Sequence, residues 1–173
     1  PALLRPGDVL VMNDSRVVPA RLHGQKIGGS ANAQMLLLEE TDDGDWWAML
    51  RPGKRLPPGA QVLLHNKRGR PTQIIATVLE KNDEGHARLK FEGTKDFLST
   101  LDQLGEAPLP PYIRRPTGNH TADTARYQTI FADSTGSVAA PTAGLHFTPT
   151  LLNALRRCGI ITCTLTHHVG FGT

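Results

Sequence analysis

The sequence contains little cysteine, no long apolar run and no low-complexity tract. Only two cysteines occur among 173 residues, Cys158 and Cys163, and their spacing matches no common zinc or redox motif. We expect one at a helix end and the other buried in a strand, in a reducing compartment. The apolar runs fall far short of the roughly 20 residues that a membrane span needs. With 39% hydrophobic and 20% charged residues, the composition indicates a soluble globular protein with a buried core.

The two ends of the sequence carry no start signal and no clear stop. The chain begins at Pro1, without an initiator methionine and without the basic and then apolar pattern of a signal peptide. It ends at Thr173, directly after a Gly-Phe-Gly turn that reads as the middle of a motif. We expect that both ends are truncated.

Positive charge is concentrated in one segment. Residues 1–50 carry a net charge of −3, residues 51–90 a net charge of +6, and residues 91–173 no net charge. The basic side chains of the middle segment are Arg51, Lys54, Arg55, Lys67, Arg68, Arg70, Lys81, Arg88 and Lys90. Such a block suits a polyanion, because each neutralised phosphate releases counterions. Charge alone slightly favours an ordinary solvated face.

Short β-like runs separated by turn signals fill the first half of the chain. The runs cover residues 20–27, 33–39, 46–51, 61–65, 72–79 and 86–91. Glycine, proline, asparagine and aspartate occupy the segments between them. Several short strands at this spacing predict a small barrel or sandwich. We therefore expect residues 20–93 to form an all-β, barrel-like domain.

The segments on either side of this domain have a mixed pattern. Before the β-domain they predict a strand over 8–13. After it they predict a helix over 97–104 that ends at Gly105, a rigid extended run over 108–113 and a short helix over 124–132. The last two predicted elements are a helix from the N-cap Thr148 and Pro149 to just before Gly159, and a strand over 160–165. A strand followed later by a helix and another strand indicates an α/β body. We expect residues 1–19 and 94–173 to form that body, with the β-domain inserted into it.

The stretch from Gly136 to Phe147 combines small residues and hydroxyls with a histidine, directly before a helix start. Small side chains let the backbone approach a ligand closely, and a helix start favours a carboxylate or phosphate. His146 can transfer protons near neutral pH, and Phe147 can stack on a base or pack in the core. A tight structural loop explains the same residues, and the stretch taken alone favours that explanation.

Two further segments carry possible binding groups. Asn13-Asp14-Ser15-Arg16 follows a predicted strand and offers a carboxylate and a guanidinium, although a plain turn has the same composition. Arg126-Tyr127-Gln128 offers a cation, an aromatic ring and an amide, which suit a nucleobase or phosphate. An ordinary helix surface also explains the second segment. Neither segment alone decides a function.

Six blocks of sequence together resemble one enzyme family. They cover residues 7–24, 51–54, 109–113, 126–129, 136–148 and 168–173. In this order they are similar to the S-adenosylmethionine:tRNA ribosyltransferase-isomerases of queuosine biosynthesis. The blocks span nearly the whole chain, so together they are far more specific than any one of them. The family fold, an α/β domain that carries a smaller β-barrel domain, agrees with the organisation predicted above.

The resemblance implies a specific reaction. Members of this family use S-adenosylmethionine as a ribosyl donor and act on 7-aminomethyl-7-deazaguanine at the tRNA wobble position. The ribosyl moiety is transferred and rearranged, which gives epoxyqueuosine and releases adenine and methionine. A base near the carbon beside the sulfonium is needed, together with a donor that protonates the leaving adenine. No metal is implied, and we expect the protein to act in the cytoplasm as a monomer.

The matching blocks supply candidate residues for this chemistry. We hypothesise that His146 and His168 transfer protons and that Asp14 orients a ribose hydroxyl or stabilises the sulfonium. The candidates for binding S-adenosylmethionine are Asn13, Ser15, Arg16, Ser137, Thr142, Ala143, Gly144 and Phe147. The candidates for binding tRNA are Arg51, Lys54, Arg55, Arg126, Tyr127 and Gln128. The family usually has leucine where this chain has His167, so the resemblance assigns His168 less firmly than His146.

Two rival functions stay open on the sequence alone. An S-adenosylmethionine-dependent RNA methyltransferase would bind the same small molecule and RNA, but no glycine-rich loop follows the first predicted strand. A non-enzymatic RNA-binding β-barrel would explain the +6 segment, but it would not explain the small residues of 136–148.

Overall fold

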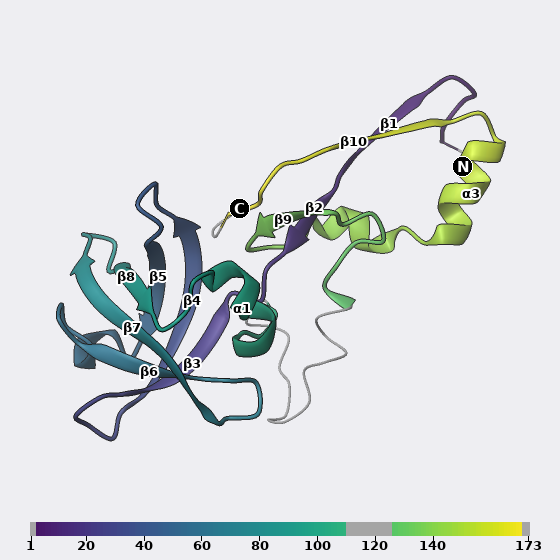
Figure 1. Ribbon diagram of the computed structural model, residues 1–173. Helices are drawn as coiled ribbons and strands as arrows, with labels where there is room; N and C mark the ends of the chain where they lie inside the picture. Colours follow the sequence, from purple (N-terminus) through teal and green to yellow (C-terminus); the bar gives the residue numbers. More distant parts are fainter. Residues whose placement is uncertain (1–2, 110–125, 171–173) are drawn as a thin grey trace. The chain divides into compact units, whose positions relative to one another are not determined.

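The computed structural model describes residues 3–109 and 126–170, which belong to two compact units (Figure 1). The first unit comes from Pro1–Val18 and Pro111–Thr173, and the second is Pro19–Pro110. We expected the β-domain to end at residue 93. The second unit continues to Pro110, so residues 94–110, which we had assigned to the α/β body, cluster with the strands instead.

The second unit is a closed barrel of six antiparallel strands. Its strands are β3 (Arg21–Lys26), β4 (Asn32–Glu40), β5 (Trp46–Arg51), β6 (Gln61–His65), β7 (Pro71–Lys81) and β8 (Ala87–Glu92). They follow one another around the barrel in the order β3-β4-β5-β8-β7-β6. Alternate side chains point inward, as Ala33, Met35 and Leu37 do in β4. The prediction of a small all-β barrel is confirmed.

A charged network lies beside the start of β5. Asp45 is only 8% exposed, and its Oδ2 accepts hydrogen bonds from Arg88 Nε at 2.9 Å and Nη2 at 2.8 Å. Asp43 and Glu80 form further ion pairs with the same guanidinium. The hydrogen bond to Asp45, with help from Glu80, raises the pKa of Arg88 above its ordinary value. Arg88 therefore neutralises a buried carboxylate and is not a free cation of the basic segment.

Helix α1 (Phe97–Leu104) packs against the barrel. The ring of Phe97 stacks on Phe91 with centroids 3.7 Å apart and lies edge-on to Trp46 at 6.3 Å. The side chain of Asp96 caps the helix by accepting a hydrogen bond from the backbone N–H of Ser99. Leu101 and Leu104 are buried, as the helical spacing of the apolar residues predicts. The helix over 97–104 is confirmed.

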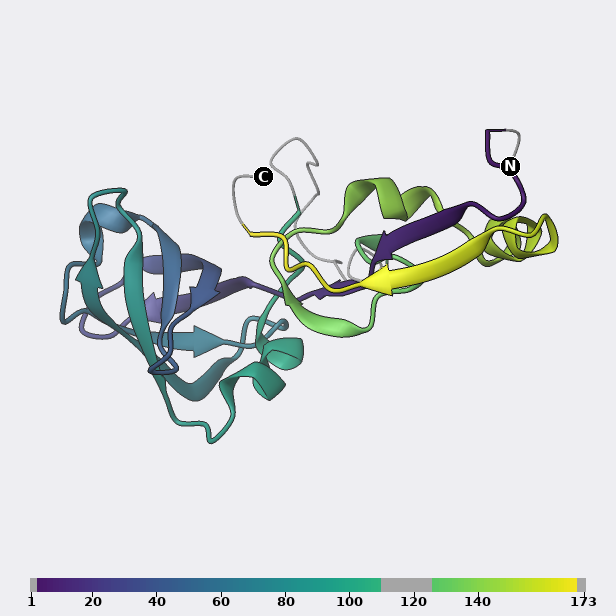
Figure 2. The same ribbon diagram turned by 90° about the horizontal axis from the view of Figure 1, so that it is seen from above.

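The first unit contains two pairs of parallel strands (Figure 2). Strand β1 (Val9–Asn13) pairs with β10 (Ile161–Leu165), and β2 (Ser15–Val17) pairs with β9 (Ser134–Ser137). Helix α3 (Pro149–Arg157) precedes β10. Met12, Leu152, Leu155 and Ile160 form the core between these elements.

Helix α3 begins and ends as the sequence predicts. Thr148 Oγ1 accepts a hydrogen bond from the backbone N–H of Leu151 at 3.1 Å, and Pro149 occupies the first turn. Gly159 has a φ of +76° just past the helix end, a conformation that favours glycine. The short chain between α3 and β10 therefore turns sharply, and β10 runs back alongside β1.

Three sequence expectations need correction or lie beyond the described residues. Of the helix expected over 124–132, the described residues show Arg126 as helical, whereas residues 127–132 form turns and irregular chain, and there the side chain of Gln128 is bonded to the backbone of β2. Cys158 caps α3 as expected, but Cys163 is exposed, since β10 pairs only with β1 among the described strands. Most of the extended run over 108–113 lies outside the described residues.

None of the helices in the described segments is long and apolar enough to span a membrane.

Candidate active site

The carboxyl ends of β1 and β10 lie side by side, because the strands are parallel and Asn13 pairs with Leu165. The next residue on each strand is polar: Asp14 after β1 and Thr166 after β10. Thr166 Oγ1 donates a hydrogen bond to Asp14 Oδ1 at 2.7 Å and lies 3.2 Å from Ser134 Oγ. We call Asp14, Ser134 and Thr166 the strand-end cluster. Carboxyl ends of parallel strands are the usual ligand position in α/β sheets.

The backbone fixes the position of Asp14. Its N–H donates to the carbonyl of Leu165 at 3.0 Å, and its carbonyl accepts from the N–H groups of Asp133 and Ser134 at 2.8 and 3.2 Å. Within the described residues, Oδ1 is used by Thr166, whereas Oδ2 has no hydrogen-bond partner. The cluster therefore presents a carboxylate oxygen in a fixed position, able to accept a hydrogen bond or to face a positive charge.

Asn13 ties the chain after β10 to the end of β1. Its Nδ2 donates to the carbonyl of His167 at 2.8 Å, and its Oδ1 accepts from the N–H groups of His167 at 3.0 Å and Ser15 at 3.1 Å. Both ends of the amide are thus used within the fold, and Asn13 positions its neighbours. The same bonds hold the backbone of His167, whose side chain is exposed.

The small residues of β9 accommodate the segment that follows β10. A side chain at Gly136 would meet the imidazole ring of His168 at 2.8 Å, so the ring lies directly against this glycine. Ser137 is fully buried; its hydroxyl donates to the carbonyl of Ala139 at 2.7 Å and accepts from the N–H of Val169 at 3.0 Å. Ser137 thus holds the His168–Val169 segment in place with a hydroxyl that the fold already uses.

The residues from Thr142 to Phe147 divide into packed and exposed positions. They form the 3₁₀ helix η2 (Thr142–His146) and the residue after it. A side chain at Gly144 would meet Thr129 Cγ2 at 2.8 Å, and Phe147 lies edge-on to Phe131 at 6.1 Å against the core. Thr142, Ala143 and His146 are exposed. In the described segments no hydrogen bond joins His146 to the strand-end cluster.

The residues beside Asp14 also differ in their surroundings. The hydroxyl of Ser15 is fully buried and has no hydrogen-bond partner among the described residues. Arg16 is exposed and donates one bond, from Nη2 to the carbonyl of Ala132 at 2.7 Å. Most of its guanidinium donors therefore remain accessible to an anion.

Of the three neighbours Arg126, Tyr127 and Gln128, only the first is exposed. Tyr127 is 8% exposed. The Gln128 amide exchanges two hydrogen bonds with the backbone of Val17, at 3.0 and 2.7 Å. Gln128 thus supports β2, Tyr127 is buried, and Arg126 is the one whose side chain is accessible.

The barrel carries a separate group of cations on the 3₁₀ helix η1 (Gly53–Arg55) and beside it. Arg51, Lys54 and Arg55 are exposed. Two other lysines fix this segment: Lys81 Nζ donates to the carbonyl of Gly53 at 2.6 Å, and Lys26 Nζ donates to that of Arg55 at 3.1 Å. We call Arg51, Lys54 and Arg55 the basic loop.

Comparison with known proteins identifies the family. The family model described as queuosine biosynthesis protein matches residues 1–173. The chain belongs to the queuosine biosynthesis protein family. The resemblance drawn from the six sequence blocks is thereby confirmed.

Curated relatives in this family have closely similar sequences. The S-adenosylmethionine:tRNA ribosyltransferase-isomerase of Synechococcus elongatus is 46% identical over all of this chain and 47% of its own length. The protein of the same name from Dehalococcoides mccartyi is 48% identical over 98% of this chain and 47% of its own. The chain thus spans about half the length of these relatives. The crystal structure of an S-adenosylmethionine tRNA ribosyltransferase from Thermotoga maritima matches with 26% identity and a TM-score of 0.41, over 97% of this chain and 43% of that one.

Two residues of this queuosine biosynthesis protein escaped the sequence analysis. Thr166 and Ser134 complete the strand-end cluster, yet neither was among the candidates. Thr166 could have been found, because it directly follows a predicted strand, as Asp14 does. Ser134 could not, because β9 was not predicted as a strand.

The described part of this family member contains no group of three or more histidine, cysteine, aspartate or glutamate side chains that could hold a metal ion. The cluster offers one carboxylate and two hydroxyls, which suit a polar organic ligand.

Proposed function

We propose that the chain forms part of an S-adenosylmethionine:tRNA ribosyltransferase-isomerase. The enzyme transfers and isomerises the ribosyl moiety of S-adenosylmethionine onto 7-aminomethyl-7-deazaguanine at the tRNA wobble position, giving epoxyqueuosine, adenine and methionine. The observation that carries this proposal is the match of the whole chain to relatives of that name at 46–48% identity. Since the chain spans 47% of those relatives, the activity belongs to a longer protein that contains it.

We assign the units of this protein to the two parts of the proposed fold. The parallel pair β1–β10, with α3 before β10, supports an α/β catalytic body built from residues 1–18 and 111–173. The closed barrel supports a domain inserted between the two parts of that body, over residues 20–93. The compact unit Pro19–Pro110 extends this inserted domain by helix α1.

The strand-end cluster is the proposed S-adenosylmethionine site. The sulfonium is positive and the ribose carries hydroxyl donors, so both groups suit the unpaired Oδ2 of Asp14. Arg16, with most of its donors accessible, suits the methionine carboxylate. The exposed Thr142 and Ala143 contribute contacts, whereas the buried Ser15 keeps the site in shape together with Asn13, Ser137, Gly144 and Phe147. Their hydrogen bonds and packing within the fold support this division.

His168 and His146 are the proposed proton-transfer groups. His168 lies against Gly136, two residues after Ser134 of the cluster, and its ring is exposed. Its backbone neighbours are held by Asn13 and Ser137, which supports a defined ring position. His146 is exposed at the end of η2. An imidazole can serve as either base or acid close to neutral pH.

The reaction products test this proposal directly. A full-length protein that contains this chain, incubated with S-adenosylmethionine and tRNA carrying the 7-aminomethyl base, is expected to release adenine and methionine. S-adenosylhomocysteine in their place would indicate the rival RNA methyltransferase. The other rival, a purely RNA-binding barrel, would produce no heat when S-adenosylmethionine is added in a calorimeter.

The basic loop is the proposed main contact of the barrel with tRNA phosphates. Replacing Lys54 and Arg55 with glutamine is expected to weaken tRNA binding and to flatten the dependence of log K on log salt by about 1.5. A matched control replaces Arg156 and Arg157, an exposed pair at the end of α3. Filter binding at several salt concentrations measures both slopes. Equal slopes for the two variants would remove the basic loop from the tRNA interface.

We further propose that Arg126 adds a phosphate contact and that the enzyme acts in the cytoplasm as a monomer, without a metal ion. The exposure of the Arg126 side chain supports the first of these assignments.

A further inference from the structure

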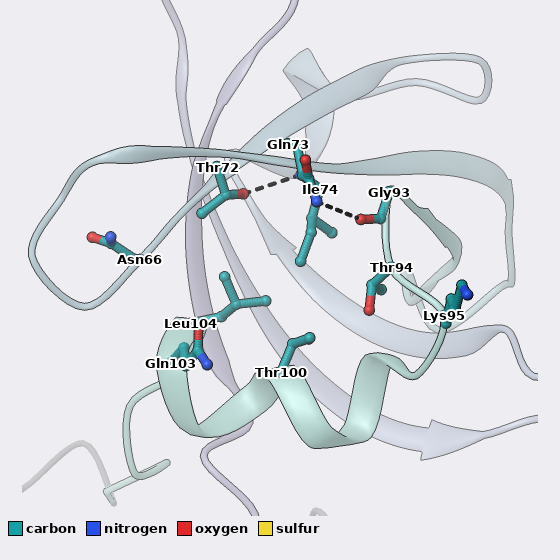
Figure 3. Close-up of a pocket in the computed structure, with 10 residues that line it drawn as sticks. All are labelled: Asn66, Thr72, Gln73, Ile74, Gly93, Thr94, Lys95, Thr100, Gln103 and Leu104. Carbon is teal, nitrogen blue, oxygen red and sulfur yellow. Dashed lines mark hydrogen bonds between the residues drawn. The ribbon is translucent and has the colours of Figure 1, made fainter.

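A polar groove runs along the barrel unit between β7 and α1 (Figure 3). Its volume is about 730 Å³, within the usual range of roughly 300–1,000 Å³ for ligand sites. Ile74 from β7 and Leu104 from α1 are buried and form an apolar floor. All of the residues that line it belong to Pro19–Pro110. No candidate from the sequence blocks lies in it.

The walls of the groove offer donors and acceptors without negative charge. None of the described residues that line it is an aspartate or glutamate. Thr72 and Thr100 donate their hydroxyl protons to backbone carbonyls. The oxygen of Thr72 also accepts a hydrogen bond from the N–H of Ile74 at 3.1 Å, so Thr100 offers the unused hydroxyl acceptor. The amide of Gln103 and the ammonium group of Lys95 have no hydrogen-bond partner in the described segments. A ligand with both donors and acceptors and a negative charge would match this set.

Positive charge flanks the groove at both ends. Lys95 lies at one end in Figure 3, and Asn66 lies at the other. Asn66 Oδ1 accepts hydrogen bonds from the backbone N–H groups of Arg68 and Arg70, both at 3.0 Å, and thereby orders the turn between β6 and β7. This turn also carries Lys67, whose N–H donates to the carbonyl of Gln103 at 3.1 Å. Three exposed cations thus sit on an ordered turn that is tied to α1.

We propose that this groove binds a single-stranded segment of RNA. Phosphates meet Lys95 and the turn of Lys67, Arg68 and Arg70, while a base and ribose lie over Ile74 and Leu104 within reach of Gln103. The inference rests on the proposed function in that it takes RNA as the substrate. The basic loop precedes β6 in the chain and shares no residue with the lining of the groove. The groove is therefore a second RNA contact of the barrel.

Binding of a short RNA to a full-length protein that contains this chain tests the groove without requiring catalysis. The probe is a fluorescent single-stranded RNA of mixed sequence, about six nucleotides long. Lys95→Gln is expected to raise its Kd about tenfold and to lower the salt slope by about 0.7. Gln103→Ala is expected to raise Kd about fivefold with the slope unchanged, because an amide neutralises no phosphate. Lys90→Gln is the matched control, since Lys90 is an exposed lysine of β8 paired with Glu92 and lies outside the groove.

The outcomes separate the groove from the proposed function. If both groove variants bind the probe as tightly as the unmodified protein while the basic-loop variant loses tRNA affinity, the groove proposal is wrong and the tRNA enzyme stands. If the unmodified full-length protein binds neither the probe nor tRNA, both fail. Amide NMR shifts at Thr72, Thr100 and Gln103 on adding the probe would support the groove. Equal shifts with polyglutamate would overturn it, because charge alone would then explain the contact.

Discussion

An Asp14→Asn substitution is expected to slow adenine release by about 100-fold or more in a full-length queuosine biosynthesis protein that carries this segment. The amide has nearly the size of the carboxylate, and its oxygen can still accept the 2.7 Å bond from Thr166. Three backbone hydrogen bonds hold the residue independently of its side chain. The substitution therefore removes charge and one acceptor oxygen while the position of the group stays the same.

The size of this effect follows from what Asp14 faces in the proposed complex. A neutral amide no longer attracts the sulfonium, and its –NH₂ group cannot accept a hydrogen bond from a ribose hydroxyl. Single-turnover adenine release with saturating S-adenosylmethionine measures the chemical step, and calorimetry measures binding separately. If the rate of adenine release falls by a larger factor than the affinity for S-adenosylmethionine, Asp14 acts mainly on the transition state.

The neighbouring Asp133 provides the control for this experiment. It is an exposed aspartate, whereas Asp14 is half-buried, and its backbone N–H donates to the carbonyl of Asp14, but its side chain has no part in the strand-end cluster. Asp133→Asn should leave adenine release unchanged. Near-wild-type turnover in Asp14→Asn, or an equal loss in both variants, would contradict the role proposed for Asp14.

Local sequence patterns were sufficient to predict the barrel strands and helices α1 and α3, but not the short strands β2 and β9. Alternating apolar residues and turn signals located all six barrel strands to within about two residues at each end, and β5 and β6 match their predicted ranges. The N-cap Thr148 and the glycine at 159 likewise defined α3. These signals succeed because each depends on residues only a few positions apart.

The roles of individual side chains depended on partners far away in the sequence. Gln128 looked like an RNA ligand, but its amide is bonded to Val17, 111 positions earlier. Ser137 looked like a cofactor ligand, but its hydroxyl is used by Val169, 32 positions later. Cys163 was expected to be buried because free cysteines usually are, yet it is exposed, since burial of a strand depends on what covers its faces. None of these partners can be read from the local pattern.

A Gly105→Ala substitution is expected to lower the free energy of unfolding of the barrel unit by about 2–4 kcal/mol. Gly105 has a φ of −96° and a ψ of 160°, which any residue adopts, so backbone strain is not the reason. A methyl group there would collide with the backbone carbonyl of Pro19. This close approach lets Glu106 exchange two backbone hydrogen bonds with Arg21, at 3.1 and 2.9 Å. The first and last segments of the unit are joined by that pair.

Gly29→Ala is the matched control, because a methyl group at Gly29 would meet only the flexible side chain of Lys26, at 3.8 Å. The main effect of this substitution is to lower the conformational entropy of the unfolded chain, so the free energy of unfolding should stay the same or rise slightly. Both tryptophans of the chain, Trp46 and Trp47, lie in β5, so their fluorescence during urea unfolding reports on the barrel. Equal midpoints for the two variants would show that Pro19 and Gly105 do not need to approach so closely, and that the barrel tolerates a looser connection between its two ends.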